Sequence, residues 1–197
     1  MRGVTILCII GLLLTAGCVG HNQVESTVKI FHGKDLESVE KSQFNLTGMD
    51  GKNWSTDEAL GKVVILSFGF INCRTTCHMV WSNIYAVLQE LTPEEREQVE
   101  VVTVTVDPWR DTPEALANFT SERGYDWIHL SGNDTAVLDV LVSHYIFISP
   151  TSEDDYDIMH QQPTYLLDRE LDRRVLWNDG NWMLELFLED LRVLLAE

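Results

Sequence analysis

Residues 63–77 read Val-Val-Ile-Leu-Ser-Phe-Gly-Phe-Ile-Asn-Cys-Arg-Thr-Thr-Cys. The segment 63–68 is almost wholly apolar and rich in branched side chains, which is typical of a strand buried on both faces. Apolar residues then recur at helical spacing over 79–91. The two cysteines, Cys73 and Cys77, are therefore predicted to lie where a central strand passes into a long helix.

The elements predicted around this segment define the fold class. They are a strand at 99–106, a helix from Thr112-Pro113 to Gly124, a helix at 134–142, strands at 164–167 and 174–177, and a helix at 182–195. The order strand–helix–strand–helix, followed by an antiparallel hairpin and a terminal helix, predicts an α/β thioredoxin-like fold with a central mixed sheet flanked by helices. Two short strands around a turn at 44–54 predict an N-terminal hairpin extension.

Composition limits the class of protein. The chain has 197 residues, of which 45% are hydrophobic, as expected for one globular domain with a short appendage. Its 31 acidic and 14 basic side chains give a formal net charge of -17. A nucleic-acid-binding protein needs a basic face to replace phosphate counterions, so we expect no nucleic-acid partner.

The N-terminus carries the marks of export. Residues 1–17 combine a basic start, an apolar run and small residues, which predicts a lipoprotein-type signal peptide ending before Cys18. We expect a lipid anchor at Cys18, a tether over 18–40 and a thioredoxin-like domain over 41–197, held at the outer face of the cytoplasmic membrane. A plain cleaved signal and an uncleaved anchor are alternatives, and each also exports the domain to an oxidising compartment.

Of the four cysteines, this division leaves Cys73 and Cys77 in the folded domain. At the start of a helix, unpaired backbone N–H groups stabilise a thiolate, and thiolates are nucleophilic and bind soft metals. A structural disulfide is the alternative, although a disulfide stabilises a fold more when it closes a long loop.

Three motifs in order resemble one known family. They are Gly61-Lys-Val-Val-Ile-Leu-Ser-Phe-Gly-Phe70, the Cys-x-x-x-Cys pair at 73 and 77, and Asp107-Pro-Trp-Arg-Asp-Thr-Pro113. Over residues 42–170 the chain is similar to the Sco/SenC family of membrane-tethered copper proteins. The resemblance implies that a thioredoxin-like domain binds one copper through Cys73, Cys77 and a distant histidine, and His160 occupies the matching position.

Donor chemistry favours Cu(I) at such a site, because two thiolates and one imidazole form a soft, three-coordinate ligand set. The chain departs from the family, which usually has proline after each cysteine and aspartate two places after the first. Here Arg74, Thr75 and His78 occupy those positions. Without the aspartate an oxygen ligand is missing, so we expect weak retention of Cu(II) unless His78 replaces it.

Two functions follow from these residues. The resemblance implies a copper chaperone that delivers copper to an acceptor protein at the membrane, such as an oxidase subunit, or prepares the thiols of its copper site. The alternative is a thiol–disulfide oxidoreductase acting on exported proteins, in which Cys73 attacks and Cys77 resolves the mixed disulfide. Pro163 resembles the cis-proline of thioredoxin-type reductases and favours this second reading. Whether the protein is an enzyme therefore stays open.

The remaining candidates have ordinary structural interpretations beside functional ones. Asp107 ends a strand near the cysteine loop, where it could orient a ligand. We expect Asp111 and Thr112 to cap the next helix and Arg110 to pair with a carboxylate. Trp109 could contact a partner. The histidines without support for a ligand role are His21, His32, His129 and His144.

Overall fold

The computed structural model describes residues 31–36, 40–74, 76–150, 158–178, 180 and 182–197. The predicted signal peptide, Cys18, most of the predicted tether and the acidic segment 151–157 lie outside these residues. Within the described part of the chain, no helix is both long and apolar enough to span a membrane.

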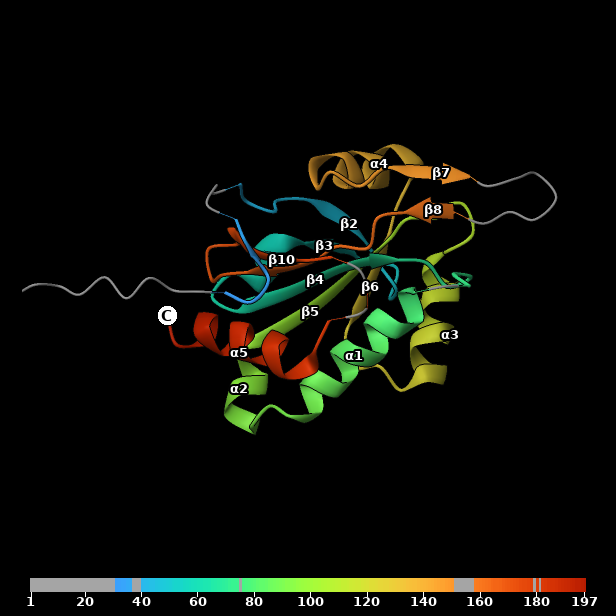
Figure 1. Ribbon diagram of the computed structural model, residues 1–197. Coiled ribbons are helices and arrows are strands. Elements are labelled where there is room, and N and C mark those ends of the chain that lie inside the picture. Colours follow the sequence, from blue (N-terminus) through green and yellow to red (C-terminus); the bar gives the residue numbers. More distant parts are fainter. Residues whose placement is uncertain (1–30, 37–39, 75, 151–157, 179, 181) are drawn as a thin grey trace, which may run out of the picture.

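An eight-stranded mixed sheet forms the centre of the molecule (Figure 1). In spatial order its strands are β1 (Lys34–Asp35), β10 (Arg173–Trp177), β9 (Thr164–Leu167), β4 (Val63–Gly69), β5 (Val99–Thr105), β6 (Ile128–Ser131), β2 (Asn45–Gly48) and β3 (Asn53–Ser55). The neighbours β4–β5 and β5–β6 are parallel, and all other neighbours in this sheet are antiparallel. The predicted N-terminal hairpin is present as β2–β3, which extends the sheet beside β6.

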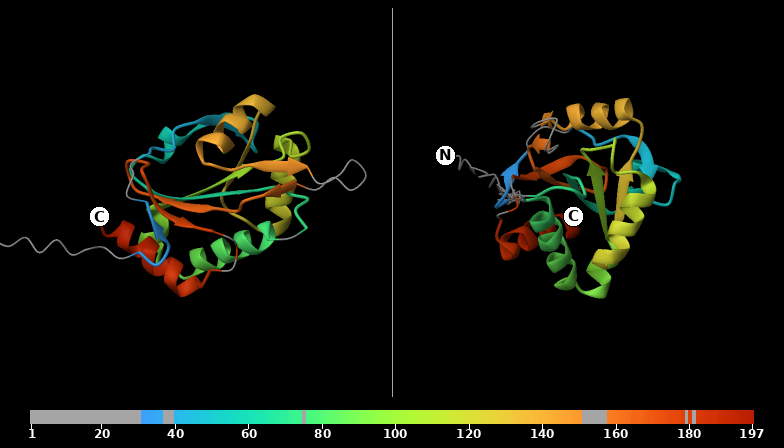
Figure 2. Two further views of the ribbon diagram at one scale, coloured as in Figure 1. Left: turned by 45° about the horizontal axis from the view of Figure 1, so that its top comes forward. Right: turned by 90° about the vertical axis from the view of Figure 1, so that its right-hand side faces the viewer.

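Helices cover both faces of this sheet. They are α1 (Cys77–Gln89), α2 (Pro93–Glu97), α3 (Pro113–Arg123), α4 (Asp134–Ser143) and α5 (Leu184–Leu195), with a short 3-10 helix η1 at Thr56–Ala59. Figures 1 and 2 show α1, α3 and α5 on one face and α4 on the other. The thioredoxin-like arrangement predicted from the element order is therefore confirmed.

Local signals in the sequence account for the boundaries of α3. The Thr112 hydroxyl accepts a hydrogen bond from the Ala115 amide, and Pro113 follows in the first helical position. Gly124 ends the helix with a φ of 68°, a left-handed conformation that glycine adopts without strain.

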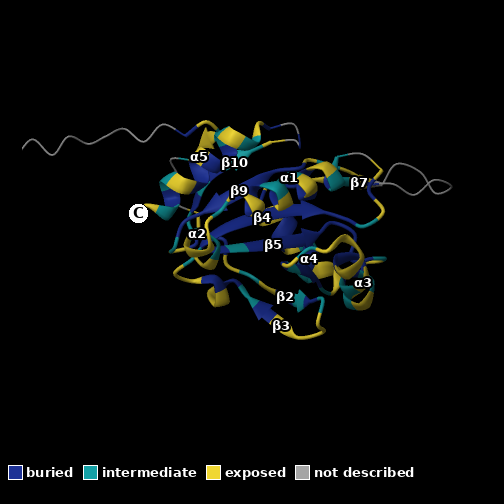
Figure 3. Ribbon diagram, turned by 90° about the horizontal axis from the view of Figure 1, so that it is seen from below, coloured by how far each residue is buried: buried dark blue, intermediate teal, exposed yellow. Residues whose placement is uncertain are grey.

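The core lies along the central strands. Every residue of β4 and of β9 is buried, and Figure 3 shows these strands in dark blue beneath helices whose outer faces are exposed. The apolar run that predicted a strand buried on both faces therefore does form one. Since parallel strands end at the same edge, the loops after β4 and β5 are neighbours, and the Val106 amide donates to the Gly69 carbonyl at 3.0 Å.

The start of the folded unit differs from the prediction. β1 and the buried Phe31 lie in the segment predicted as a tether, yet β1 pairs with β10. The buried carboxylate of Asp190 accepts hydrogen bonds from the amides of His32 and Gly33 and from the Trp177 indole. Lys34 and Asp35 therefore belong to the sheet, and Phe31, His32 and Gly33 are packed or hydrogen-bonded against the folded domain. The sequence did not predict this strand, because two residues are too few to show periodicity and because the carboxylate that binds its backbone, Asp190, lies far away in the sequence.

The small antiparallel sheet of β7 (Ile148–Pro150) and β8 (Ile158–His160) was not predicted either. Its strands are three residues long, too short to show alternation. The pairing of Ile148 with His160 holds β8 against β7, and His160 at its end lies beside the cysteine loop.

Candidate metal centre

The cysteine loop joins β4 to α1. The Cys73 amide donates to the Phe70 carbonyl at 3.2 Å, and the Cys77 amide points at the Cys73 sulfur at 3.4 Å. Cys77 is the first residue of α1, as expected for a thiolate-stabilising position. Gly69 makes this close packing possible, because a Cβ there would lie 2.8 Å from the Trp81 ring and 3.1 Å from the Cys77 Cβ.

The structure brings Cys73, Cys77 and His160 together. The two sulfurs are joined in a disulfide, and both cysteines are buried. The His160 Nε2 lies 3.5 Å from the Cys77 sulfur, and one candidate ligand atom from each residue lies within 4.8 Å of the others. Three residues separated by up to 87 positions in the sequence therefore form one cluster.

Hydrogen bonding determines which nitrogen of His160 faces the sulfurs. Nδ1 lies 2.6 Å from the Gln161 carbonyl oxygen, which can only accept, so Nδ1 carries the proton. Nε2 then presents its lone pair to the cysteines, as a metal-binding imidazole must. The Phe70 ring packs edge-on against the imidazole at 5.8 Å between centroids, which further restricts its orientation.

These three donors fit a soft metal ion. Once the disulfide is reduced, two thiolates and one neutral imidazole make a ligand set that suits Cu(I). A structural zinc site would need a fourth ligand to complete a tetrahedron. His78 is not in the cluster: its ring packs against Trp81 and Phe119 at 5.6 and 5.8 Å, and burial lowers its pKa. Thr75 lies outside the described residues.

A residue that the sequence analysis did not assign also contacts the sulfurs. The Gln162 Nε2 lies 3.2 Å from the Cys77 sulfur and 3.9 Å from that of Cys73. This side chain is only 7% exposed. The sequence held one signal for this contact: Gln162 stands two residues after His160, and alternate residues of an extended segment share a face.

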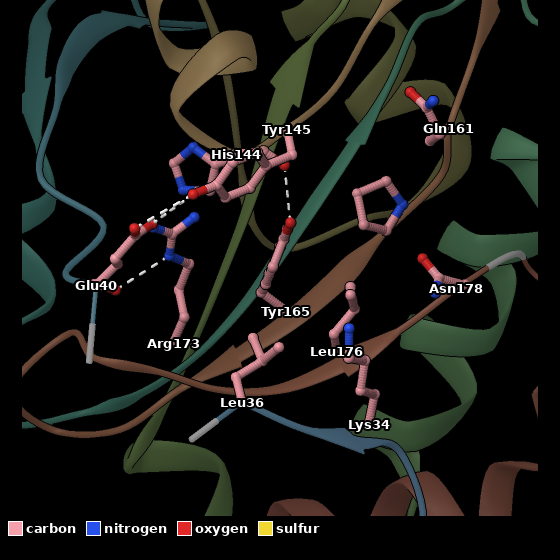
Figure 4. Close-up of a pocket in the computed structure, with 11 residues that line it drawn as sticks. Lys34, Leu36, Glu40, His144, Tyr145, Gln161, Tyr165, Arg173, Leu176 and Asn178 are labelled. Carbon is pink, nitrogen blue, oxygen red and sulfur yellow. Dashed lines mark hydrogen bonds and ion pairs between the residues drawn. The ribbon is translucent and has the colours of Figure 1, made fainter. Parts of the chain in front are cut away.

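The other face of the same segment lines a cavity of about 290 Å³ (Figure 4). Gln161 and Pro163 border this cavity, so segment 160–163 separates it from the sulfurs. Within it the buried Arg173 pairs with Glu40. No cis peptide bond occurs among the described residues, so the resemblance of Pro163 to a reductase cis-proline is not reproduced.

Asp111 has a role that differs from the prediction. Of the two residues predicted to cap α3, Thr112 does so and Asp111 does not. The Asp111 Oδ2 instead accepts hydrogen bonds from the Ile71 amide at 3.1 Å and from the Thr105 hydroxyl at 2.7 Å, which holds the start of the cysteine loop. Arg110 pairs with the buried Asp107, as expected, and lies 5.8 Å over the Phe70 ring.

Burial of Asp111 predicts a pH-dependent stability. Burial raises the pKa of this carboxyl from 3.8 to about 6, so the folded protein binds the proton more tightly than the unfolded chain. The contribution of protonated Asp111 to the free energy of unfolding is fully present below about pH 4. It is lost as the pH rises through about 6, by about 3 kcal/mol in all. Asp111→Asn should remove this dependence.

The measurement is urea unfolding of both proteins between pH 4 and pH 8. The wild-type free energy of unfolding should fall relative to that of Asp111→Asn as the pH rises, mostly between pH 4 and 6. A difference between the two proteins that stays constant across this range would contradict the shifted pKa.

The other candidates are dispersed. The Trp109 indole N–H donates to the Asp134 carboxylate at 2.7 Å. Because Trp109 is 45% exposed, its ring is still accessible to a partner. His129 and His144 are buried, and desolvation lowers the pKa of each to about 4, which keeps them neutral core residues. The exposed His32 pairs with Glu189. His21 lies outside the described residues.

Comparison with known proteins decides the family. The SCO1/SenC family model matches residues 33–191. The chain belongs to the SCO1/SenC family. The match begins within the predicted tether, in agreement with the observed pairing of β1.

Individual relatives of this SCO1/SenC protein show the same likeness. A SCO2-like protein of Rickettsia prowazekii is 29% identical over 130 residues, which cover 64% of this chain and 63% of the relative. The chain thus spans less than two thirds of that relative's length.

Two solved structures resemble this one closely. A SCO1/SenC family lipoprotein from Bacillus anthracis is 28% identical with a TM-score of 0.71, covering 85% of this chain and 100% of the other. Bradyrhizobium japonicum ScoI with copper bound is 27% identical with a TM-score of 0.68, covering 78% and 98%.

Proposed function

We propose that this protein is a copper-binding chaperone that holds one Cu(I) through Cys73, Cys77 and His160. The observation that carries the proposal is the cluster of two sulfurs and one imidazole nitrogen, within 4.8 Å of one another, in a chain of the SCO1/SenC family. Copper bound to the Bradyrhizobium relative supports the choice of metal. When bound, the ion is the cargo, and the residues bind it and release it.

The structure of the site suits transfer. Three protein ligands leave Cu(I) open to a further ligand, so an acceptor can bind the ion before the donor residues release it. Proteins of the Sco family take part in cytochrome c oxidase assembly. We infer that the acceptor is a copper site of a terminal oxidase, which the chaperone loads with copper or whose thiols it prepares.

We further propose that the domain acts outside the cytoplasmic membrane, anchored by lipid at Cys18. The small residues before Cys18 support this, as does the lipoprotein nature of the Bacillus anthracis relative. Processing would then leave the two site cysteines as the only thiols of the mature domain.

A thiol–disulfide oxidoreductase is the second candidate, and the disulfide between Cys73 and Cys77 is the observation that favours it. In that function Cys73, which is 5% exposed against 0% for Cys77, would attack the substrate disulfide. Both functions need the same reduced pair, so they are compatible as consecutive steps at one acceptor.

Anaerobic titration with Cu(I) tests the primary proposal. The full chain is used in detergent, reduced, with Cys8 and Cys18 changed to serine so that only the site thiols remain. We expect one Cu(I) per chain in competition with a chelator. Cys77→Ser should weaken binding by more than about 100-fold, because loss of a ligand exceeds the 10–100-fold typical of outer contacts.

Two controls complete this experiment. Ser82→Ala, a change on an exposed residue of α1, should leave the affinity unchanged. Binding of Cu(I) that is indifferent to Cys77→Ser, or absence of one-to-one binding in the reduced parent protein, would refute the copper site and leave the oxidoreductase as the better function.

A further inference from the structure

A buried amide beside the sulfurs plays no part in the proposed ligand set. Gln162 follows β8 and lies behind the cysteine pair, 3.2 Å from the Cys77 sulfur through Nε2. Its Oε1 is buried without a hydrogen-bond partner among the described residues. The hydrogen bonds that this side chain makes among the described residues are therefore those that its NH₂ group donates to the two sulfurs.

The contact distinguishes between the states of the sulfurs. The amide NH₂ can only donate, and a thiolate is a charged acceptor, whereas a disulfide sulfur is a weak neutral one. Hydrogen bonds to charged acceptors are roughly twice as strong as neutral ones. Gln162 therefore stabilises the reduced pair more than it stabilises the disulfide.

The same contact acts on a bound metal. Hydrogen bonds to a cysteine ligand are among the factors that tune the redox potential of protein-bound copper. A donor to the sulfur withdraws electron density from it, and Cu(II) depends on that density more than Cu(I) does. An amide at this position accordingly favours Cu(I), in line with the soft ligand set.

We propose that Gln162 is a positioning residue that biases Cys73 and Cys77 toward the reduced form and bound copper toward Cu(I). The part that concerns copper rests on the proposed function. The part that concerns the disulfide needs no metal, so the two can fail separately.

Equilibrium with glutathione measures the disulfide part. Two glutathione thiols reduce the Cys73–Cys77 disulfide: its S–S bond breaks, one glutathione disulfide forms, and two electrons and two protons pass to the protein sulfurs. The chain is used in full, in detergent, with Cys8 and Cys18 changed to serine. The fraction of reduced protein at each glutathione ratio gives the equilibrium constant.

Three variants separate hydrogen bonding from packing. Gln162→Leu keeps the size of the side chain and removes the donor, and Gln162→Glu replaces the donor with a charged acceptor. Gln89→Leu is the matched control, because it makes the same change on an exposed glutamine at the far end of α1 from the cysteines.

We expect Gln162→Leu to lower the equilibrium constant for reduction by about tenfold, equivalent to a potential about 30 mV more negative. Gln162→Glu should lower it further, because a carboxylate repels thiolates. Gln89→Leu should stay within about twofold of the parent. The equilibrium constant is thus expected to fall from the parent to Gln162→Leu and again to Gln162→Glu, as a hydrogen-bond donor is replaced first by an apolar group and then by a negative charge. Loosened packing alone would not produce this order. Equal constants for the parent and Gln162→Leu would overturn the proposal.

Circular dichroism first establishes that each variant is folded. If Gln162→Leu is not, Gln162→Asn takes its place: its amide is one methylene too short for the contact, and the same decrease is expected.

The copper part is measured on the Cu(II) complex. Gln162→Leu should retain Cu(II) better than the parent, and its sulfur-to-copper charge-transfer band should lie at longer wavelength. An unshifted band and unchanged retention would overturn this part. Failure of the parent to bind copper at all, together with the expected shift in the glutathione equilibrium, would refute the proposed function but not the redox role of Gln162.

Discussion

His160→Ala is expected to weaken Cu(I) binding by about 100-fold or more while leaving thiol–disulfide exchange at the cysteine pair nearly unchanged. The imidazole is the single non-sulfur donor of the cluster, and its Nε2 is held toward the Cys77 sulfur by the hydrogen bond from Nδ1 to the Gln161 carbonyl. Removing it leaves two thiolates that can still form and break a disulfide. The variant therefore separates the copper chaperone from the oxidoreductase.

Cu(I) competition and exchange with a model peptide disulfide are the two measurements. His32→Ala is the matched control, because it removes an exposed histidine that pairs with Glu189 and lies outside the cluster. If His160→Ala binds Cu(I) as tightly as the parent, the three-ligand site is wrong. If it instead loses disulfide exchange, His160 belongs to the thiol chemistry.

Gly69→Ala is expected to damage both the fold and the site. The added Cβ would lie 2.8 Å from the Trp81 ring, closer than Cβ contacts come, and 3.1 Å from the Cys77 Cβ, which would have to shift. Both neighbours are buried, so neither can move into solvent. Overpacking of this kind typically costs about 1–3 kcal/mol, and here the strain falls on Cys77, a proposed copper ligand. We expect lower stability together with weaker Cu(I) binding.

Gly124→Ala distinguishes strain at the site from general destabilisation. Gly124 has a φ of 68° and open space where a Cβ would stand, so alanine there costs about 1 kcal/mol through the backbone alone. It should lower the thermal midpoint without changing Cu(I) affinity. An equal loss of affinity in both variants, measured below their unfolding transitions, would show that Gly69 has no specific role at the site.

Most of the element order was predictable because its signals are local. β4 is marked by a continuous apolar run, and α3 by a capping threonine and a proline at its start and a glycine at its end. Each of these signals spans only a few residues. The start of α1 was predicted at 79 but lies at Cys77, because helix ends depend on caps more than on periodicity. β1 and the β7–β8 pair were missed because strands of two or three residues carry no period.

The two cysteines of the site were deduced from their place between a strand and a helix, and His160 from the resemblance to a family. Neither argument could find Gln162 or the true role of Asp111. Each depends on a contact across the fold: Gln162 reaches Cys77 over 85 positions, and Asp111 reaches Ile71 over 40.

Sequence alone was thus sufficient for the α/β class, the order of its main elements and the chemistry of a soft-metal or redox pair, because periodicity, capping and residue type are properties of short segments. Tertiary structure alone decided what surrounds that pair: the imidazole nitrogen that faces the sulfurs, the amide behind them and the buried carboxylate that holds their loop. Burial and hydrogen bonding between distant segments are absent from the unfolded chain. They arise only when the fold brings the loops after β4 and β5 together at one edge of the central sheet, with the end of β8 beside them.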